Sequence, residues 1–181
     1  MGRIVYVTGN SFNNLGDLAM IEGFLRELRR LAPQARATFL GHDEQRLRLA
    51  IGRHLEAGHG WAWAPAVCVS AHEGWRYLLH VVNYRRLGLR PKVRWSAAAR
   101  AARTGKPSGH PQLDALLGAI READLVVIGG GGVLNELFGL LEGAWIVCQA
   151  AQAAEVPVAA LGQTVGPFRS GRSMRLFREI V

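Results

Sequence analysis

Three short polar or glycine-rich stretches hold the residues of this chain whose types could do chemistry. The first ends in Asn14–Asp17, the second is the glycine run Gly129–Gly132, and the third begins at Gln163 and Thr164. Glycines let the backbone approach a ligand with no side chain in the way. Amide and hydroxyl side chains form hydrogen bonds with polar ligands, and a carboxylate such as Asp17 can accept a proton. These stretches are therefore candidates for a ligand site.

Each stretch follows an apolar segment and precedes a segment with helical periodicity. Short apolar segments predict buried strands, and apolar residues at every third or fourth position predict amphipathic helices. The strands expected before the three stretches are Ile4–Thr8, Leu125–Ile128 and Val156–Leu161. The helices expected after them are Leu18–Leu31, Val133–Ala154 and one that begins at Arg172.

Further strands are expected at Ala37–Leu40 and Ala66–Ser70, and further helices at Asp43–Leu55 and Gln112–Glu122. The alternation of strands and helices predicts one α/β domain over residues 1–181, a three-layer Rossmann-like domain with a mainly parallel sheet. In such a sheet the three stretches would share the carboxyl edge, where ligands bind. The apolar face of the first helix is expected to contain Ile21, Leu25, Leu28 and Leu31.

Each candidate residue also has a structural explanation. The glycines could bring backbone N–H groups, at the positive end of a helix dipole, against a phosphate, carboxylate or sugar hydroxyl, or could permit tight packing between strand and helix. Asp17 could deprotonate a hydroxyl or only cap its helix. Asn14 could contact ligand oxygens or only shape its turn. Asn135 and Glu136 are expected in the first turn of the long helix, within reach of a ligand.

The candidates therefore comprise one catalytic residue and nine substrate-binding residues. They are Asp17 for proton transfer, and Asn14, Gly16, Gly129, Gly130, Gly131, Gly132, Asn135, Gln163 and Thr164 for binding.

Composition limits the function classes. The chain has 181 residues, of which 49% are hydrophobic, so a disordered chain is excluded. No signal peptide is visible, and Cys68 and Cys148 lie in apolar runs as expected of buried free thiols, which fits a cytoplasmic protein. The histidines lack the spacing of metal ligands, so no metal is assigned. Neither a G-x-G-x-x-G fingerprint nor a P-loop is present.

The segment 73–113 is basic and aromatic. Nine basic residues and no acidic one lie between Glu73 and Asp114 in a chain of net charge +8. A helical insertion or connection is expected here. Residues 75–106 could contact an anionic membrane surface, or the segment could be an exposed helical pair whose aromatic side chains face the core. Nucleic acid is disfavoured because no recognition motif accompanies the charge.

The three stretches together resemble the polysaccharide pyruvyl transferase family. Asn14–Asp17 before an amphipathic helix, the string ADLVVIGGGGVLNE and the string LGQTVGP occur in the family's order and spacing. The resemblance implies the N-terminal half of a two-domain GT-B-type enzyme. It also implies that phosphoenolpyruvate is the donor substrate, with no cofactor, and that the acceptor is a glycan or a lipid-linked saccharide. The product would be a pyruvyl ketal on a cell-surface glycan or its precursor, made in the cytoplasm or at the inner face of the cell membrane.

Two other functions stay open at this point. One is a GT-B-type glycosyltransferase that uses a nucleotide sugar, and the other is a non-enzymatic module that binds a sugar phosphate or nucleotide. The last helix stops at Val181, and its apolar stripe of Met174, Phe177 and Val181 has little to pack on. We therefore expect a C-terminal domain to follow in the natural protein, and little turnover by residues 1–181 alone. The same stripe leaves pairing with another copy of the chain open.

Overall fold

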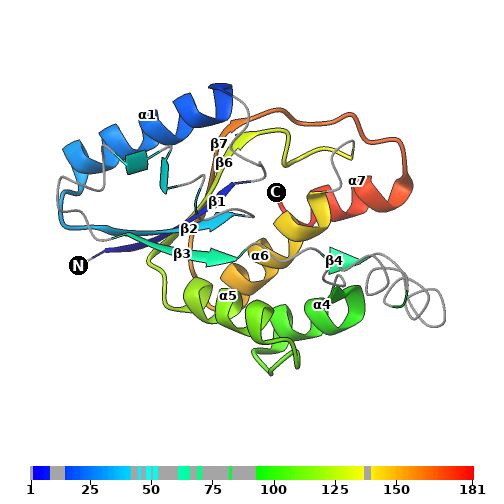
Figure 1. Cartoon of the computed structure of the whole chain (residues 1–181). Coiled ribbons are helices and arrows are strands. Elements are labelled where there is room, and N and C mark those ends of the chain that lie inside the picture. The colour runs from blue at the N-terminus through cyan, green and yellow to red at the C-terminus, as the bar shows by residue number, and fades with distance from the viewer. Residues whose placement is uncertain are drawn as a thin grey trace.

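The computed structural model describes residues 2–8, 15–41, 45, 48, 49, 51, 52, 61–65, 69, 70, 82, 93–136 and 140–181. Its centre is a five-stranded sheet in which all strands run parallel, in the order β3-β2-β1-β6-β7 (Figure 1). The strands are β1 (Arg3–Thr8), β2 (Arg36–Gly41), β3 (Trp61–Pro65), β6 (Leu125–Gly131) and β7 (Val158–Gln163). The two-residue strands β4 (Val69–Ser70) and β5 (Val93–Arg94) pair with each other outside this sheet.

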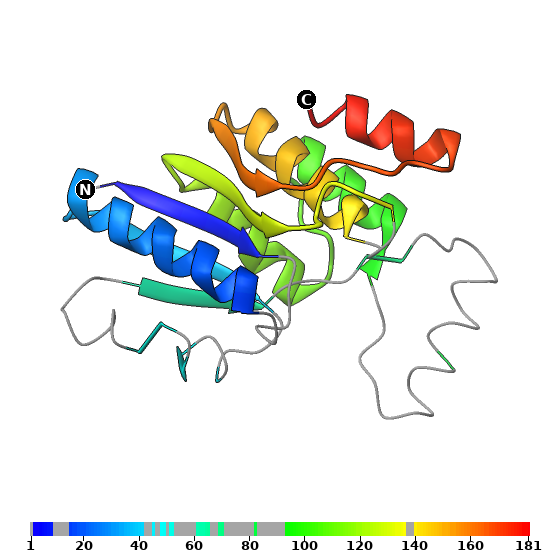
Figure 2. The same cartoon turned by 90° about the horizontal axis from the view of Figure 1, so that it is seen from above.

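Helices cover both faces of the sheet and form the outer layers (Figures 1 and 2). Helix α1 lies on one face, α5 and α6 lie on the other, and α4 and α7 pack on α6. Their bounds are α1 (Leu15–Leu31), α4 (Trp95–Thr104), α5 (Pro111–Arg121), α6 (Leu141–Ala153) and α7 (Gly171–Arg178). The sequence therefore correctly predicted the three-layer Rossmann-like architecture.

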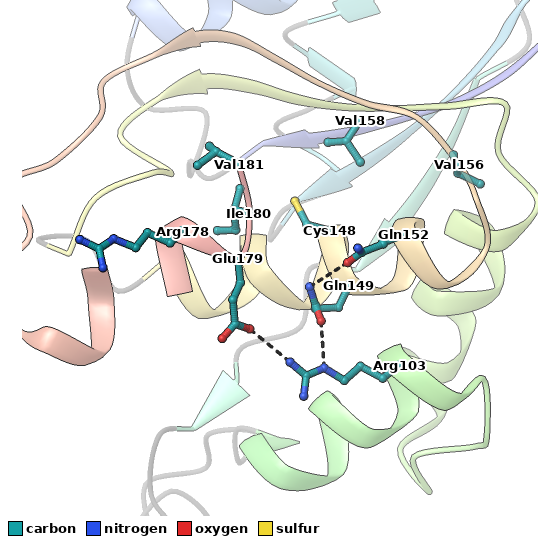
Figure 3. A pocket seen from close by; sticks show the side chains of 10 residues that line it. All are labelled: Arg103, Cys148, Gln149, Gln152, Val156, Val158, Arg178, Glu179, Ile180 and Val181. Atoms are coloured by element: carbon teal, nitrogen blue, oxygen red, sulfur yellow. Dashed lines mark hydrogen bonds and ion pairs between the residues drawn. The ribbon is translucent and has the colours of Figure 1, made fainter. Parts of the chain in front are cut away.

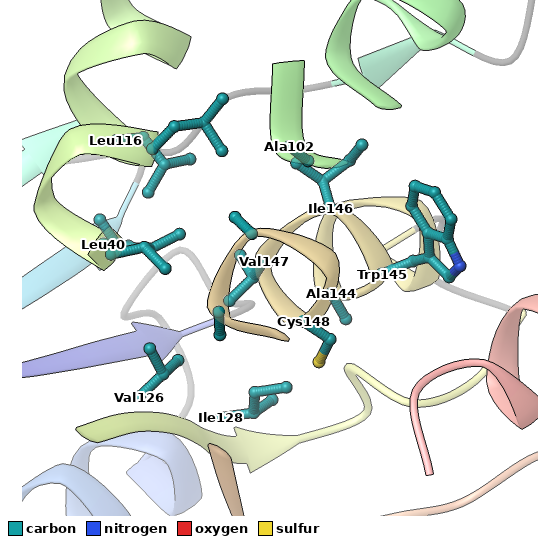
Figure 4. Packing of buried hydrophobic residues seen from close by; sticks show 14 of the residues in the cluster. Leu40, Ala102, Leu116, Val126, Ile128, Ala144, Trp145, Ile146, Val147 and Cys148 are labelled. Carbon is teal, nitrogen blue, oxygen red and sulfur yellow. The ribbon is translucent and has the colours of Figure 1, made fainter. Parts of the chain in front are cut away.

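Alternation along the central strands divides the core between the two faces. Ile4 and Tyr6 of β1 are buried against α1, whereas Val5 between them is buried in the cluster that contains α4, α5 and α6 (Figure 4). Successive side chains of a strand point to opposite faces, so a strand buried on both faces is apolar throughout. Each large apolar side chain buried in this way contributes roughly 1.5–3 kcal/mol to stability.

The described parts of the first half of the chain follow the predicted pattern with two differences, whereas most of the expected helix Asp43–Leu55 lies outside the described residues. The third strand of the sheet is Trp61–Pro65. Of the expected strand Ala66–Ser70, Val69 and Ser70 form the two-residue β4, and residues 66–68 lie outside the described residues. Trp61–Pro65 was missed because its alanines and Pro65 have low strand propensity, whereas the valines that favour a strand come later, in Ala66–Ser70. On α1, Ile21 and Leu25 are buried, but Leu31 is 69% exposed because the helix ends there, beyond the sheet.

The strand before the glycine run is longer than predicted, and the helix after it begins later. Strand β6 includes the first three glycines and ends at Gly131. The predicted helix Val133–Ala154 begins only at Leu141, and residues 132–136 form turns and bends. Backbone hydrogen bonds explain the difference, because the Leu134 carbonyl accepts from Gly166 and the Glu136 N–H donates to Pro167. These bonds to the third stretch replace the bonds of a first helical turn.

The C-terminal elements are shifted along the chain. Strand β7 starts at Val158 and ends at Gln163, two residues later than predicted, so Gln163 belongs to the strand rather than to the turn after it. Helix α7 buries Leu176 to 6% exposure, and the Phe177 ring stacks on Phe168 at 4.7 Å. Of the predicted stripe, Phe177 packs on the core, whereas Met174 and Val181 are 36% and 82% exposed. The prediction missed Leu176, which is buried.

Most of the segment 73–113 lies outside the described residues. Its described part comprises Val82 and residues 93–113, which contain α4 and the start of α5. Cys148 is a buried free thiol, as predicted, whereas Cys68 lies outside the described residues. In the part of the chain that the structure describes, no helix combines the length and the apolarity needed to span a membrane.

Candidate ligand site at the carboxyl edge of the sheet

The ends of β1, β6 and β7 lie side by side at one edge of the sheet. In the strand register Thr8 is opposite Gly129, and Gly131 is opposite Gln163. The second and third stretches are in direct contact beyond the strands, because the Thr164 N–H donates to the Gly131 carbonyl at 3.0 Å. The predicted convergence is therefore confirmed for these two stretches. The first stretch follows β1 at the same edge, and its residues 9–14, with Asn14, lie outside the described residues.

The sheet itself requires the glycine at position 129. A Cβ at Gly129 would lie 2.0 Å from both Cζ and Oη of Tyr6 on the neighbouring strand. The Tyr6 ring is 1% exposed and packs against Phe24 and Phe39 at centroid distances of 4.5 and 5.5 Å. Packing therefore explains Gly129, although the contact joins two strands and not, as expected, a strand and a helix. The signal for this contact was a bulky aromatic residue in β1, Tyr6, two residues before the position opposite Gly129 and therefore on the same face of the sheet.

Gly130 and Gly131 are required by backbone conformation. Their φ angles are 81° and 68°, a left-handed region in which side chains with a Cβ are strained. The backbone turns there and leads into the non-helical residues 132–136. Since the helix begins only at Leu141, the positive end of its dipole is not next to these glycines. The prediction that a helix dipole assists anion binding is therefore wrong for this turn, and contact between its backbone N–H groups and a ligand stays a prediction.

Glu136 holds the turn against α7 and does not lie in the first turn of α6. Its carboxylate accepts hydrogen bonds from the backbone N–H groups of Arg169 and Ser170, the latter at 3.0 Å. These two bonds hold the pKa of the Glu136 carboxyl below its ordinary value of 4.5. Ser170 is also the N-cap of α7 and accepts from the Ser173 N–H at 3.1 Å. Glu136 is therefore a structural residue at the start of α7.

Gln163 carries an unsatisfied acceptor at this edge. Its Nε2 donates to the carbonyls of Ile128 and Leu161, both at 3.2 Å, which fixes the orientation of the amide. The other amide atom, Oε1, is buried and accepts no hydrogen bond from the residues that the structure describes. Buried polar atoms nearly always have partners, and leaving one without costs about 1–3 kcal/mol. Gln163 Oε1 therefore marks a position where a donor from a ligand or a water would be stabilised.

The remaining candidates are placed around the same edge. Asp17 lies in the first turn of α1, where its backbone is described and its side chain is not. Gly16 precedes it in that turn, and Thr164 follows Gln163 directly. The start of α1 reaches the third stretch, because a Cβ at Gly162 would lie 2.8 Å from Met20 Sδ.

Asn135 is 2% exposed, so it is buried beneath the turn rather than presented on a helix as predicted. In the described residues no three His, Cys, Asp or Glu side chains are placed to bind a metal ion. The ligand roles of all the candidate residues stay predictions.

The fold defines the general class of this protein as a Rossmann-like α/β domain with a parallel sheet. The family model of polysaccharide pyruvyl transferase matches residues 14–181, and the chain therefore belongs to this family of transferases. Comparisons with curated proteins and with solved structures find no match.

Proposed function

We propose that the protein transfers a pyruvyl group from phosphoenolpyruvate to two hydroxyl groups of a sugar. Membership in the polysaccharide pyruvyl transferase family supports this reaction. Both hydroxyl oxygens bond to C2 of the enolpyruvyl group, whose bond to the phosphate oxygen breaks. One hydroxyl proton ends on the methylene carbon, which becomes the ketal methyl, and the other leaves with the phosphate. The acceptor is a glycan or lipid-linked saccharide of the cell envelope.

The observation that carries the proposal at this edge is the buried Oε1 of Gln163, which accepts no hydrogen bond from the described part of the chain. An acceptor atom selects a ligand that donates a hydrogen bond. A sugar hydroxyl donates, whereas the ionised phosphate and carboxylate of phosphoenolpyruvate only accept. We therefore assign the acceptor sugar, and not phosphoenolpyruvate, to the carboxyl edge of this domain. Donor binding would then fall to a second domain in a GT-B-type arrangement.

Asp17 is the proposed general base for an acceptor hydroxyl. It lies in the first turn of α1, directly beyond the stretch that follows β1 at the same edge. A positioned carboxylate that removes a hydroxyl proton contributes roughly 10²–10⁴-fold to the rate. Asp17→Asn should therefore lower kcat by about 10²-fold or more, with little change in the KM for the acceptor. Glu22→Gln is the matched control, because Glu22 is an exposed carboxylate on the same helix, 3.8 Å from Arg26.

The reaction is tested by incubating the full-length protein with phosphoenolpyruvate and a panel of glycans. Phosphate release that depends on an acceptor, together with a ketal on the product, is the expected result. No such release across the panel would refute pyruvyl transfer, and turnover of a nucleotide sugar would then identify a glycosyltransferase.

Gln163→Met tests the assignment of the acceptor to this edge. This variant should raise the KM for the acceptor about two- to tenfold, the cost of one lost hydrogen bond, without raising the KM for phosphoenolpyruvate. The control is Gln152→Met, because Gln152 is an exposed glutamine on α6. An increase in the KM for phosphoenolpyruvate alone would place the donor at this edge instead.

A further inference from the structure

A cavity lies among the helices α4, α6 and α7. It has a volume of about 350 Å³, and residues of α4, α6 and α7 line it together with Glu179. The charged and aromatic side chains of its lining are Trp95, Trp145, Arg103, Arg172, Arg175 and Glu179. A larger neighbouring cavity of about 670 Å³ shares Arg103 and Glu179 with it (Figure 3). No residue of the five-stranded sheet lines the smaller cavity.

The lining has an excess of positive charge. Three arginines face one carboxylate, that of Glu179. The Glu179 carboxylate already accepts hydrogen bonds from Arg103 at 3.2 Å and from the Trp145 indole N–H at 2.8 Å. Arg175 makes no ion pair through its side chain with any residue that the structure describes. Like charges gathered at one cavity repel one another, and an anion bound there would relieve the repulsion.

Two of the guanidinium groups are held on aromatic rings. Arg103 Cζ lies 4.7 Å from the centre of the Trp145 ring, and Arg172 Cζ lies 5.2 Å from that of Trp95. The two indole rings are themselves 4.8 Å apart. Arg103 is further fixed by its Nε bond to Gln149 at 2.9 Å (Figure 3). Arg103 also donates through Nη2 to Glu179. Both stacked guanidinium groups are therefore already held in place, so little further entropy is lost when an anion binds.

The sequence around α4 does not supply a balancing charge. No acidic residue occurs between Glu73 and Asp114, a stretch that includes α4 and its Arg100 and Arg103. Among the described residues, the one other carboxylate paired with the lining is that of Glu142, at 3.7 Å from Arg172. At that distance the partly exposed pair is weak. The excess charge therefore persists around the cavity.

We propose that Arg103, Arg172 and Arg175 form a binding site for a phosphate group. Guanidinium groups match the oxygens of phosphate in paired, charge-assisted hydrogen bonds. A volume of about 350 Å³ is within the usual range for a small-ligand site and would hold a diphosphate. The phosphate could belong to a soluble compound or to a lipid headgroup. The site is independent of the acceptor site at the carboxyl edge and of the proposed pyruvyl transfer.

The test measures binding of inorganic pyrophosphate by titration calorimetry at low salt. The variant is Arg172→Gln with Arg175→Gln, and the matched control is Arg26→Gln with Arg30→Gln, which removes the same charge from exposed positions of α1. The cavity variant should weaken binding at least about tenfold, because each charge-assisted bond lost is worth about a factor of ten. The control should leave binding within about twofold of the unaltered protein. If the double variant does not fold, the same binding measurement is made on Arg175→Gln alone.

Vesicles distinguish the two sources of phosphate. Cosedimentation with vesicles of phosphatidylglycerol, compared with neutral phosphatidylcholine, tests the headgroup. If pyrophosphate does not bind but the cavity variant alone abolishes sedimentation with the anionic vesicles, the ligand is a lipid phosphate. Equal loss in the cavity variant and its control would show that total charge, and not the cavity, attracts the anion. That result, or no binding to either probe, overturns the proposal.

Discussion

Gly129→Ala should destabilise the protein through a collision with Tyr6, whether or not a ligand binds nearby. The added Cβ would lie 2.0 Å from two atoms of the Tyr6 side chain and 2.6 Å from Cε2. Ordinary van der Waals contacts begin near 3.4 Å, so the ring or the strand must move by about 1.4 Å. Tyr6 cannot move freely, because Phe24 and Phe39 pack against its ring.

The magnitude follows from two opposing effects. Overpacking in a closely packed core costs about 1–3 kcal/mol. Replacing glycine by alanine within a strand recovers roughly 0.5–1 kcal/mol of backbone entropy. We therefore expect a net loss of about 1–2 kcal/mol in the free energy of unfolding, or roughly 2–8 °C in Tm for a domain of this size.

Chemical denaturation of Gly129→Ala, Tyr6→Leu and the double variant measures this effect. The shorter Leu side chain leaves room for the added Cβ. Gly129→Ala should therefore lower the free energy of unfolding by at least about 0.5 kcal/mol less in the Tyr6→Leu protein, which is the usual size of coupling between residues in contact. Gly118→Ala is the control, because a Cβ there meets nothing within 4 Å and should be neutral or stabilising. A cost that is the same with and without the Tyr6 ring would refute the packing explanation of Gly129.

Three further predictions follow from single groups. The folded-state pKa of Glu136 lies below its ordinary 4.5, so its carboxylate stabilises the fold above that pH and stops doing so as the pH falls through the folded-state value. Glu136→Gln should therefore flatten the fall of Tm below pH 4.5, and an unchanged fall would contradict this role of the carboxylate. Burial raises the pKa of the Cys148 thiol to about 11, so a thiol reagent at pH 8 should label the Cys68→Ser protein only on unfolding, whereas rapid labelling would show an open site. Leu176→Ala should cost about 2–4 kcal/mol in chemical denaturation because Leu176 is 6% exposed, whereas Met174→Ala, 36% exposed on the same helix, should cost under about 1 kcal/mol, and equal costs would refute the packing of α7.

The sequence predicts the strands well where both faces of a strand are buried. Leu125–Ile128 is continuously apolar, and the structure buries it between α1 and α6. Trp61–Pro65 at the far edge was missed because its alanines and proline have low strand propensity. Val158 and Leu161 of the opposite edge strand are 41% and 47% exposed, which explains why burial did not fix the predicted bounds of β7. A hydrophobicity pattern therefore locates a strand well only where the strand is buried in the core.

The helix after the glycine run could not be located from periodicity. Val133 and Leu134 are apolar and buried, and they fit a helical pattern with the residues after them. What prevents a helix there is tertiary, because the Leu134 carbonyl accepts from Gly166, 32 residues away. The capping of α7 by Glu136 is equally non-local, since its partner Ser170 lies 34 residues away along the chain. Such contacts have no counterpart in a local sequence pattern.

The structure also separates the candidate residues by what already explains them. Packing against Tyr6 accounts for Gly129, and two backbone N–H groups account for the Glu136 carboxylate. Gln163 is different, because its Nε2 donates to carbonyls of β6 and β7, whereas its Oε1 has no hydrogen-bond partner among the described residues. A core residue chosen for packing alone would avoid the cost of that unpaired acceptor. Gln163, between the ends of β6 and β7, is therefore the residue on which our proposal for ligand recognition at this edge rests.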